Sequence, residues 1–488
     1  MTTSARLGVT DLPVVIQGGM GVGVSGWRLA GAVSRAGGLG VVSGVALDTL
    51  LARRLQDGDP DGTVRSAMSE FPVAHVADSV LKRWLVSGGR SSGRPYRPVP
   101  RLRLDSGVER QRLAVVAAFV EIHLARAAAP GAAVGVNFME KLQMATPAAA
   151  YGAMLAGVDV VLVGAGIPAR IPALLDALAD HRAVQFPVDV AGEAAGHHLS
   201  FDPRAVMGGA LPALSRPAFL AIVSSHTLAT FLARDPATRP EGFVIEGHVA
   251  GGHNAPPRGA TRLDGMGEPV YGDRDRPDLG QIAALGLPFW LAGGYSRPEL
   301  VAAARATGAR GVQVGTLFAL SSESGLAESI RRRLLAQLAA GELRVRTDPN
   351  ASPTGFPFKV VELDETLSDE SVYDRRRRTC DLGYLRTPYR DASGRIAYRC
   401  SAEPVSTYVK KGGTVAQTAG RVCLCNGLTS AVGLGQVRAG GGNEPSIVTL
   451  GTDVDGARSL LRMHGRGWTA AQVIAYLSAQ VGSSLPTA

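Results

Sequence analysis

The chain has 488 residues, of which 45% are hydrophobic and only 19% are charged, below the usual ~25%. This composition excludes disorder over most of the chain and supplies enough apolar side chains for a large core. Aromatic residues make up 5%, too few for a surface that stacks single-stranded nucleic acid, so no nucleic-acid partner is expected. The 51 Lys and Arg outnumber the 42 Asp and Glu, which gives a net charge of +9.

The basic excess is mostly arginine and clusters at two runs, Arg331–Arg333 and Arg375–Arg378. Over this length the net charge is a mild bias, and a solvated face would explain it. The alternative is a basic contact surface for a phosphorylated cofactor, a CoA thioester or an acidic carrier domain.

The first residues, Met1 to Thr10, lack a basic segment followed by an apolar one, so no signal peptide is expected. The best apolar candidate, Val158–Ile167, is interrupted by glycine, and no apolar run reaches the ~18 residues of a spanning helix. We therefore expect a cytoplasmic protein with no membrane partner.

Short β-branched apolar runs alternate with Ala- and Leu-rich segments of helical period along the first 340 or so residues. Strands are predicted at Pro13–Gln17, Leu39–Ser43, Ala133–Asn137, Val158–Val163, Phe219–Ser224, Gly242–Glu246, Pro288–Leu291 and Gly311–Val314. Helices are predicted near Trp27–Ala36, Gln111–Ala127, Pro168–Ala179 and Leu326–Ala340.

This rhythm favours a closed (β/α)₈ TIM barrel, an α/β fold, over an open sheet. In an open sheet the phosphate-binding glycines usually lie in the first βα turn. Here glycine-rich turns follow the first, sixth, seventh and eighth strands, and a barrel uses the C-terminal ends of all its strands. The barrel is predicted to span residues 1–340.

Three segments do not fit the repeat. Residues 55–108 are rich in Arg, Gly, Ser and Pro and are predicted to be a partly mobile excursion. Residues 182–217 are predicted to be a second insertion. Residues 341–488 lack the βα rhythm and hold all four cysteines, so we predict a separate C-terminal extension.

Two glycine-rich motifs mark the first and sixth strand ends. In the first, Gly19 and Met20 would let a planar cofactor approach the backbone. A tight turn between strand and helix would explain these residues equally well. In the second, Gly251 and Gly252 precede His253, whose imidazole suits proton transfer near neutral pH. His248 is a weaker candidate, because its spacing from His253 makes a poor zinc site without a third ligand.

The seventh and eighth strands end in Gly293-Gly294 and Gly315-Thr316. Exposed N–H groups in such turns bind phosphate well, and a barrel keeps its phosphate site at these two strands. The alternative is a pair of left-handed turns without a ligand. Two such turns at adjacent strands favour a phosphate site.

The extension carries Cys380, Cys400, Cys423 and Cys425. They suggest either a Cys₄ zinc or iron–sulfur site, or buried free thiols and thiols facing the active site; no metal ligands are assigned. Tyr384–Arg399 is predicted to form a hairpin, and the loop at Lys410-Lys411-Gly412-Gly413 has anion-binding potential. We also predict that the extension folds over the barrel mouth as a lid and narrows the choice of substrate.

The glycine motifs together with Val136-Asn137-Phe138 resemble the nitronate monooxygenase family, once called 2-nitropropane dioxygenases, over residues 10–340. That family also contains FMN-dependent enoyl-carrier-protein reductases. The resemblance implies an FMN-binding barrel in which His253 matches the catalytic histidine, which takes the α-proton of a nitroalkane or binds the nitronate. We predict that His253 is the catalytic base. The resemblance also implies that Gly19, Met20 and Asn137 line the flavin, that Gly251 and Gly252 lie beside it, and that Gly293, Gly294, Gly315 and Thr316 hold its phosphate.

The resemblance implies an oxidoreductase that uses molecular oxygen to convert alkyl nitronates into a carbonyl compound and nitrite. The alternative is an enoyl-thioester reductase that uses NAD(P)H in fatty-acid or polyketide assembly. A third hypothesis is a non-catalytic flavin- or ligand-binding component of a larger complex. A homodimer is compatible with these features. The chain departs from typical members in its two insertions, its extension and the stretch Asn254–Gly259 after His253.

Overall fold

A computed structural model describes residues 8–193, 196–438 and 441–479. Eight parallel strands form one sheet in the order β1-β10-β9-β8-β7-β4-β3-β2. They are β1 (Val15–Gln17), β2 (Gly40–Ser43), β3 (Val134–Met139), β4 (Val160–Gly164), β7 (Ala218–Val223), β8 (Gly242–Glu246), β9 (Phe289–Ala292) and β10 (Gly311–Val314). Each agrees with its predicted boundaries to within two residues.

The sheet closes into a barrel between its first and last members. The Gln17 amide donates to the Leu39 carbonyl and the Leu39 amide donates to the Val15 carbonyl, both at 2.9 Å. These two bonds join β1 to the chain that enters β2. The predicted (β/α)₈ fold is therefore confirmed.

The barrel interior is filled by apolar side chains that form a cluster of their own. Trp290 is fully buried there, and its indole nitrogen donates to the Pro13 carbonyl at 3.0 Å. Because helices cover the outer face as well, the strands are buried on both faces and appear in the sequence as continuous apolar runs.

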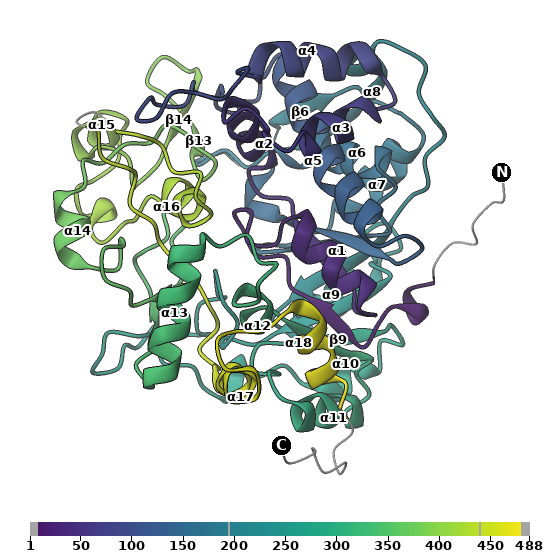
Figure 1. Ribbon diagram of the computed structural model, residues 1–488, viewed down its shortest axis with the longest axis vertical. Helices are drawn as coiled ribbons and strands as arrows, with labels where there is room; N and C mark the ends of the chain where they lie inside the picture. Colours follow the sequence, from purple (N-terminus) through teal and green to yellow (C-terminus); the bar gives the residue numbers. More distant parts are fainter. Residues whose placement is uncertain (1–7, 194–195, 439–440, 480–488) are drawn as a thin grey trace.

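Seven helices of the barrel wall follow the strands in the expected alternation (Figure 1). They are α1 (Trp27–Arg35), α5 (Val108–Ala128), α6 (Thr146–Leu155), α7 (Ile171–Ala179), α9 (His226–Arg234), α10 (Leu279–Ala283) and α11 (Pro298–Ala306). Across the described residues, no helix combines the length and apolarity needed to cross a membrane.

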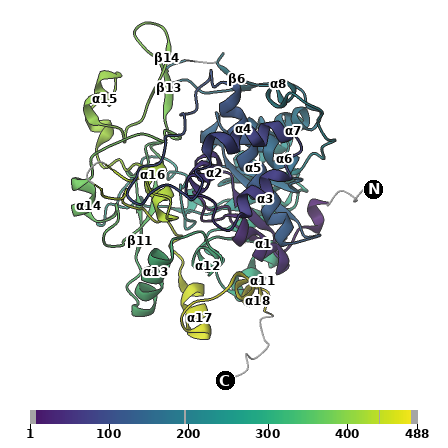
Figure 2. The ribbon, with the colours of Figure 1, turned by 45° about the horizontal axis from the view of Figure 1, so that its top comes forward.

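The last two helices of the chain complete this wall. Helix α18 (Ala470–Leu477) packs on α1, α11 and α12 (Thr316–Ala319), while α17 (Asp455–His464) packs on α12 and α13 (Glu328–Ala340). Figures 1 and 2 show α17 and α18 beside α11, away from the rest of the extension. All eight barrel strands thus lie before the boundary predicted at residue 340. The helices of the barrel wall do not, since α17 and α18 return to it from the end of the chain.

The excursion predicted at residues 55–108 needs a correction. It contains two helices, α3 (Thr63–Ser69) and α4 (Ala74–Trp84), which follow α2 (Leu47–Gln56) and pack against α5. Their buried apolar side chains recur at helical spacing, as at Val76 and Val80, but the glycine- and arginine-rich stretch after Trp84 dominated the composition.

The second insertion is a small antiparallel hairpin followed by a short helix. It comprises β5 (Val184–Pro187), β6 (His198–Phe201) and α8 (Pro203–Met207). Residues 194 and 195, within the predicted 182–217 segment, lie outside the described residues.

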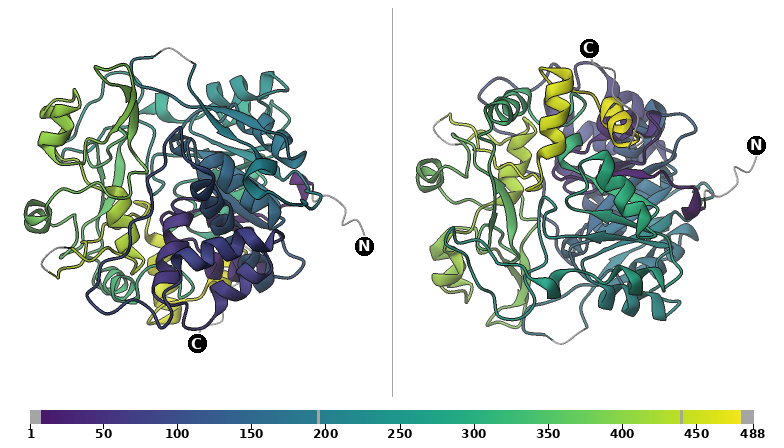
Figure 3. Two further views of the ribbon diagram at one scale, coloured as in Figure 1. Left: turned by 90° about the horizontal axis from the view of Figure 1, so that it is seen from above. Right: turned by 90° about the horizontal axis from the view of Figure 1, so that it is seen from below.

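The extension adds two further hairpins and three helices along one side of the barrel (Figure 3). They are β11 (Val345–Asp348) with β12 (Phe358–Val361), β13 (Thr387–Arg390) with β14 (Ile396–Arg399), α14 (Glu370–Arg375), α15 (Val405–Lys410) and α16 (Leu424–Ala431). The β13–β14 pair is the predicted hairpin. The single-turn 3₁₀ helices are η1 (Val9–Asp11), η2 (Glu140–Leu142), η3 (Asp273–Asp275) and η4 (Ala416–Thr418).

A buried polar network fastens the extension to the barrel. The Tyr384 hydroxyl lies 2.6 Å from the Thr49 hydroxyl and donates to the Asp48 carboxylate, which also pairs with the Arg110 guanidinium. Asp48, Thr49 and Arg110 come from α2 and α5 and are all buried. Because each charge has a partner, burying this group is compatible with a fixed position for the extension.

Candidate active site

A cavity of about 480 Å³ lies at the C-terminal ends of the barrel strands. All ten residues predicted for the site line it: Gly19, Met20, Asn137, Gly251, Gly252, His253, Gly293, Gly294, Gly315 and Thr316. They come from the ends of β1, β3, β8, β9 and β10, which parallel strands in a barrel bring to one mouth.

The floor of the cavity requires glycine at position 19. A Cβ atom there would lie 2.3 Å from the Asn137 Cβ, so any larger residue would displace Asn137. The Met20 sulfur approaches from the same turn, 3.4 Å from where a Cβ of Gly315 would stand. Small residues therefore leave a flat surface between β1, β3 and β10.

The turn after β9 has a backbone that favours glycine. Gly293 and Gly294 have φ angles of +83° and +89°, in the left-handed region. A Cβ on Gly293 would also meet the Gly247 carbonyl oxygen at 2.8 Å. The neighbouring Thr316 hydroxyl accepts a hydrogen bond from the Gly451 amide at 2.9 Å, which brings the extension to the edge of these turns.

The glycine–histidine loop is held in place by the extension. The Gly252 amide donates to the Thr449 hydroxyl at 2.8 Å, and the Gly252 carbonyl accepts from the Lys359 amide at 2.9 Å. The next amide, that of Asn254, donates to the Pro357 carbonyl at 2.9 Å. His253 is thus fixed between two backbone bonds from residues more than one hundred positions away.

His253 faces the cavity as a neutral imidazole. Its Nε2 lies 2.6 Å from the Ser352 hydroxyl, and its ring meets Phe358 edge-on at 4.9 Å. Burial, helped by the positive charge of Lys141, lowers the pKa of His253 to about 3. Nδ1 has no partner among the described residues, so it remains for a ligand.

This pKa shift has a consequence for stability. Unfolded His253 takes up a proton near its ordinary pKa of 6.5, whereas folded His253 stays neutral down to about pH 3. The unfolded state therefore binds more protons between these values, and the free energy of unfolding is expected to fall as the pH drops below 6.5. Thermal unfolding of the wild type and His253→Asn at pH 6.5 and at about pH 4.5 tests this. Equal acid sensitivity in both proteins would contradict it.

The cavity fits a flat cofactor that carries a phosphate. Two buried acceptors on its wall, Gln313 Oε1 and Asn254 Oδ1, have no hydrogen-bond donor among the described residues. Buried acceptors of this kind are normally satisfied. A ring with N–H groups beside Gly19, and a phosphate at the two glycine turns, would suit these surroundings.

Residues 215–350 match the family model described as nitronate monooxygenase. This match confirms the predicted resemblance to that family. It includes His253 and the turns after β9 and β10, whereas Gly19, Met20 and Asn137 lie outside it.

A curated relative, the (3aS,4S,5R,7aS)-5-hydroxy-7a-methyl-1-oxo-octahydro-1H-indene-4-carboxyl-CoA dehydrogenase of Mycobacterium tuberculosis, is 29% identical over 153 residues. That alignment spans 31% of this chain and 38% of the relative, so the chain matches well under two thirds of the relative's length.

Two solved structures are distantly similar. Nitroalkane oxidase from Streptomyces ansochromogenes is 18% identical with a TM-score of 0.45, over 96% of both chains. FabK from Thermotoga maritima is 17% identical with a TM-score of 0.45, over 95% of this chain and 91% of that chain. At such scores the fold assignment rests on the strand pairing described above.

His248 is not part of the cavity wall. It is exposed and stacks on Tyr271 with ring centroids 4.3 Å apart. Among the described residues, no group of three or more His, Cys, Asp or Glu side chains is arranged to hold a metal ion. The structure therefore gives no support to a zinc site built from the two histidines.

Two ionisable residues of the cavity that sequence reasoning did not select have a pKa of about 7. Lys141, directly after β3, has its pKa lowered by burial to about 7, and Glu246, at the end of β8, has its pKa raised by burial to about 7. The sequence could have identified Glu246, because it lies at the C-terminal end of a barrel strand, where active-site residues are found. Lys141 could not be identified in this way, because its burial depends on Phe356 and other residues of the extension.

The four cysteines divide between two places. Cys380, Cys400 and Cys423 pack together with Ala402, while Cys425 lines the main cavity. Burial raises the pKa of Cys423 to about 11, which keeps it a thiol. All four are free cysteines among the described residues, and the choice between a metal site and buried thiols stays a prediction.

The basic residues of the extension mainly form ion pairs and hydrogen bonds within the protein. Lys411 pairs with the buried Glu403 at 2.7 Å, so the predicted anion-binding loop already has a partner. Arg376 pairs with the buried Glu444, and Arg378 donates to the Thr418 carbonyl at 2.8 Å. Arg376 and Arg378 also line a second cavity of about 310 Å³. This part of the arginine run is therefore not simply a solvated face.

Proposed function

We propose that this chain is an FMN-dependent oxidoreductase that oxidises alkyl nitronates with molecular oxygen to a carbonyl compound and nitrite. The observation that carries the proposal is a neutral His253 facing a cavity whose glycine turns leave room for a flavin. The family match over residues 215–350 supports it. A cytoplasmic location and a homodimer remain predictions.

The chain's own residues would bind and orient the cofactor. Gly293, Gly294, Gly315 and Thr316 would receive the phosphate, because their turns present backbone N–H groups at adjacent strand ends. Gly19, Met20 and Asn137 would lie against the ring. When bound, FMN supplies the electron acceptor that no side chain provides.

The pKa of His253 defines its role in this reaction. A general base works best when its pKa lies near the operating pH, and a value of about 3 makes His253 a weak base. We therefore revise the role of catalytic base that the family resemblance suggests. His253 would serve as a neutral hydrogen-bonding partner for a nitronate that has already lost its α-proton.

Purified protein, or protein reconstituted with FMN, is expected to show flavin absorbance near ~370 and ~450 nm. Anaerobic addition of ethyl nitronate should bleach the ~450 nm band without NADPH, because the nitronate itself donates the electrons. Absorbance spectra measure the bound flavin, and stopped-flow absorbance measures its bleaching by the nitronate. A colourless protein that does not take up FMN would refute the proposal.

The second candidate is an enoyl-thioester reductase that uses NAD(P)H. The cavity lined by Arg376, Arg378 and Arg421 favours it, since guanidinium groups suit the phosphates of a nucleotide or a phosphopantetheine arm. The curated relative is named for a carboxyl-CoA substrate, which points in the same direction. Rapid anaerobic bleaching by NADPH, with none by the nitronate, would favour this candidate.

A further inference from the structure

Lys141 is a buried cation without a counter-ion. It lies in η2 directly after β3, and its Nζ is shielded from solvent with no hydrogen-bond partner among the described residues. The ammonium lies over the ring of Phe356. An ammonium buried without an acceptor is costly, so its position calls for a partner that binds there.

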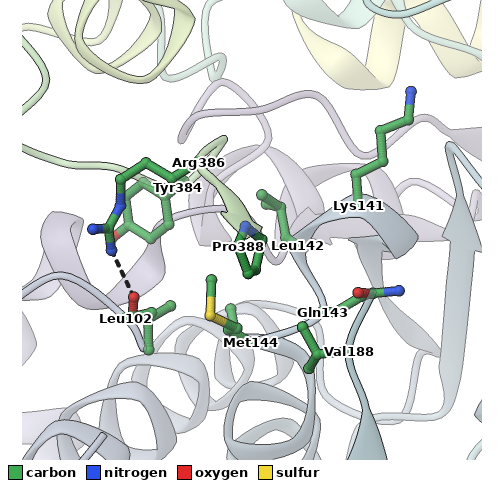
Figure 4. A pocket seen from close by; sticks show the side chains of 10 residues that line it. Leu102, Lys141, Leu142, Gln143, Met144, Val188, Tyr384, Arg386 and Pro388 are labelled. Carbon is green, nitrogen blue, oxygen red and sulfur yellow. Dashed lines mark hydrogen bonds between the residues drawn. The ribbon is translucent and has the colours of Figure 1, made fainter. Parts of the chain in front are cut away.

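The ammonium belongs to the main cavity and not to the small pocket behind it. Lys141, Leu142 and Tyr384 line both spaces, but the small pocket holds only about 30 Å³. Figure 4 shows the Lys141 side chain extending away from Tyr384, Pro388 and the other side chains of that pocket. The ammonium is therefore directed away from the small pocket, and Lys141 also lines the main cavity.

Lys141 and His253 act on the same space. The positive charge of Lys141 contributes to lowering the His253 pKa, so the two side chains lie close enough to interact electrostatically. Because His253 is neutral, Lys141 supplies the positive charge on this wall. The carboxylates of the same cavity do not neutralise it: Asp453 accepts from the Ser296 hydroxyl at 2.7 Å, and Glu246 forms no ion pair within the described residues.

We propose that Lys141 binds the negatively charged group of the substrate, so that the cavity selects small organic anions over their neutral conjugates. This inference rests on the proposed function and assigns the residue that recognises the charge of the substrate. Lys141 would hold the anion's oxygens, and His253 would contribute a neutral hydrogen bond.

The burial of Lys141 favours an anion beside it. A bound anion would supply the acceptor that Lys141 lacks and would favour its charged form. Free Lys141 is only partly protonated at neutral pH, because burial lowers its pKa to about 7. Anion binding above this pH should therefore be accompanied by uptake of a proton.

The test uses the full chain loaded with FMN, and propionate against propionamide as a matched pair of probes with no turnover. Lys141→Met should weaken propionate binding by ~10- to 100-fold, as expected for loss of a charged hydrogen bond, and leave propionamide binding unchanged. Lys141→Arg should restore most of the affinity. Lys82→Met, at an exposed lysine of α4, is the control. Isothermal titration calorimetry measures binding, and steady-state assays should show a matching rise in KM for ethyl nitronate with little change in kcat.

Unchanged propionate affinity in Lys141→Met would overturn the inference. Equal weakening of propionate, propionamide and FMN would also overturn it, because Lys141 would then support the cofactor or the fold. If the wild type binds propionate through Lys141 but oxidises no nitronate, the anion site stands and the proposed function fails. If nitronate oxidation is normal in Lys141→Met, the proposed function stands and the anion site fails.

Discussion

Replacing His253 with asparagine is expected to lower kcat/KM for nitronate oxidation by about 10²–10³-fold, as for loss of one preorganised hydrogen-bonding group. FMN binding should change little, because the turns proposed to receive the phosphate follow β9 and β10 and do not depend on the imidazole. Asparagine has no atom at the position of Nε2, so the contact with Ser352 that orients the side chain is lost together with the imidazole ring. Steady-state kinetics with ethyl nitronate, together with a flavin titration, measure the two effects separately.

Ser352→Ala is the matched control for this variant. It removes the 2.6 Å contact to Nε2 but keeps the imidazole, so the loss should be only about three- to tenfold. Should His253→Asn retain every activity assayed, the chain would instead be a non-catalytic flavin- or ligand-binding component of a larger complex. Equal losses in the two variants would mean that His253 acts only by holding Ser352.

The barrel was predictable because its signals are local. Each strand is a short apolar run, and all but β3 end at or beside glycine or another small residue. The same locality made the candidate residues accessible, since glycine pairs at strand ends such as Gly293-Gly294 depend on the backbone angles of a single turn. Parallel strands then bring the ends together without any further information.

What the sequence did not reveal depends on contacts between distant residues. The partner of His253 is Ser352, 99 positions away, and the side chain over which Lys141 lies is Phe356. Helix α18 reaches the barrel wall from the far end of the chain, where Trp468 donates to the Leu317 carbonyl at 2.8 Å. No periodicity within a segment encodes such pairings.

The extension also limits how the lid hypothesis is tested. Deleting residues 341–488 would remove α18 and the strand β12 that pairs with the His253 loop, so the barrel itself would be damaged. Side chains of the extension do line the cavity, including Phe356, Tyr384 and Cys425. Whether they narrow the choice of substrate is better tested by single substitutions at these positions.

Gly293→Ala is expected to weaken FMN binding by at least tenfold. The substitution forces alanine into a left-handed backbone with φ of +83°, which costs about 1–2 kcal/mol. Its Cβ would also stand 2.8 Å from the Gly247 carbonyl oxygen and 3.0 Å from the Ala250 amide. Since those atoms are backbone, the turn must shift, and the N–H groups proposed to receive the phosphate would move with it.

Gly308→Ala separates the two components of this effect. Gly308 has a similar φ of +91°, has nothing within 4 Å of its Cβ position and does not line the cavity. It should therefore lose stability through backbone strain alone and bind FMN as the wild type does. Thermal unfolding without FMN compares the strain, and flavin fluorescence titration compares the affinity. If Gly293→Ala and Gly308→Ala bound FMN equally well, the turn after β9 would not be the phosphate site, and the cofactor would have to be placed elsewhere in the cavity.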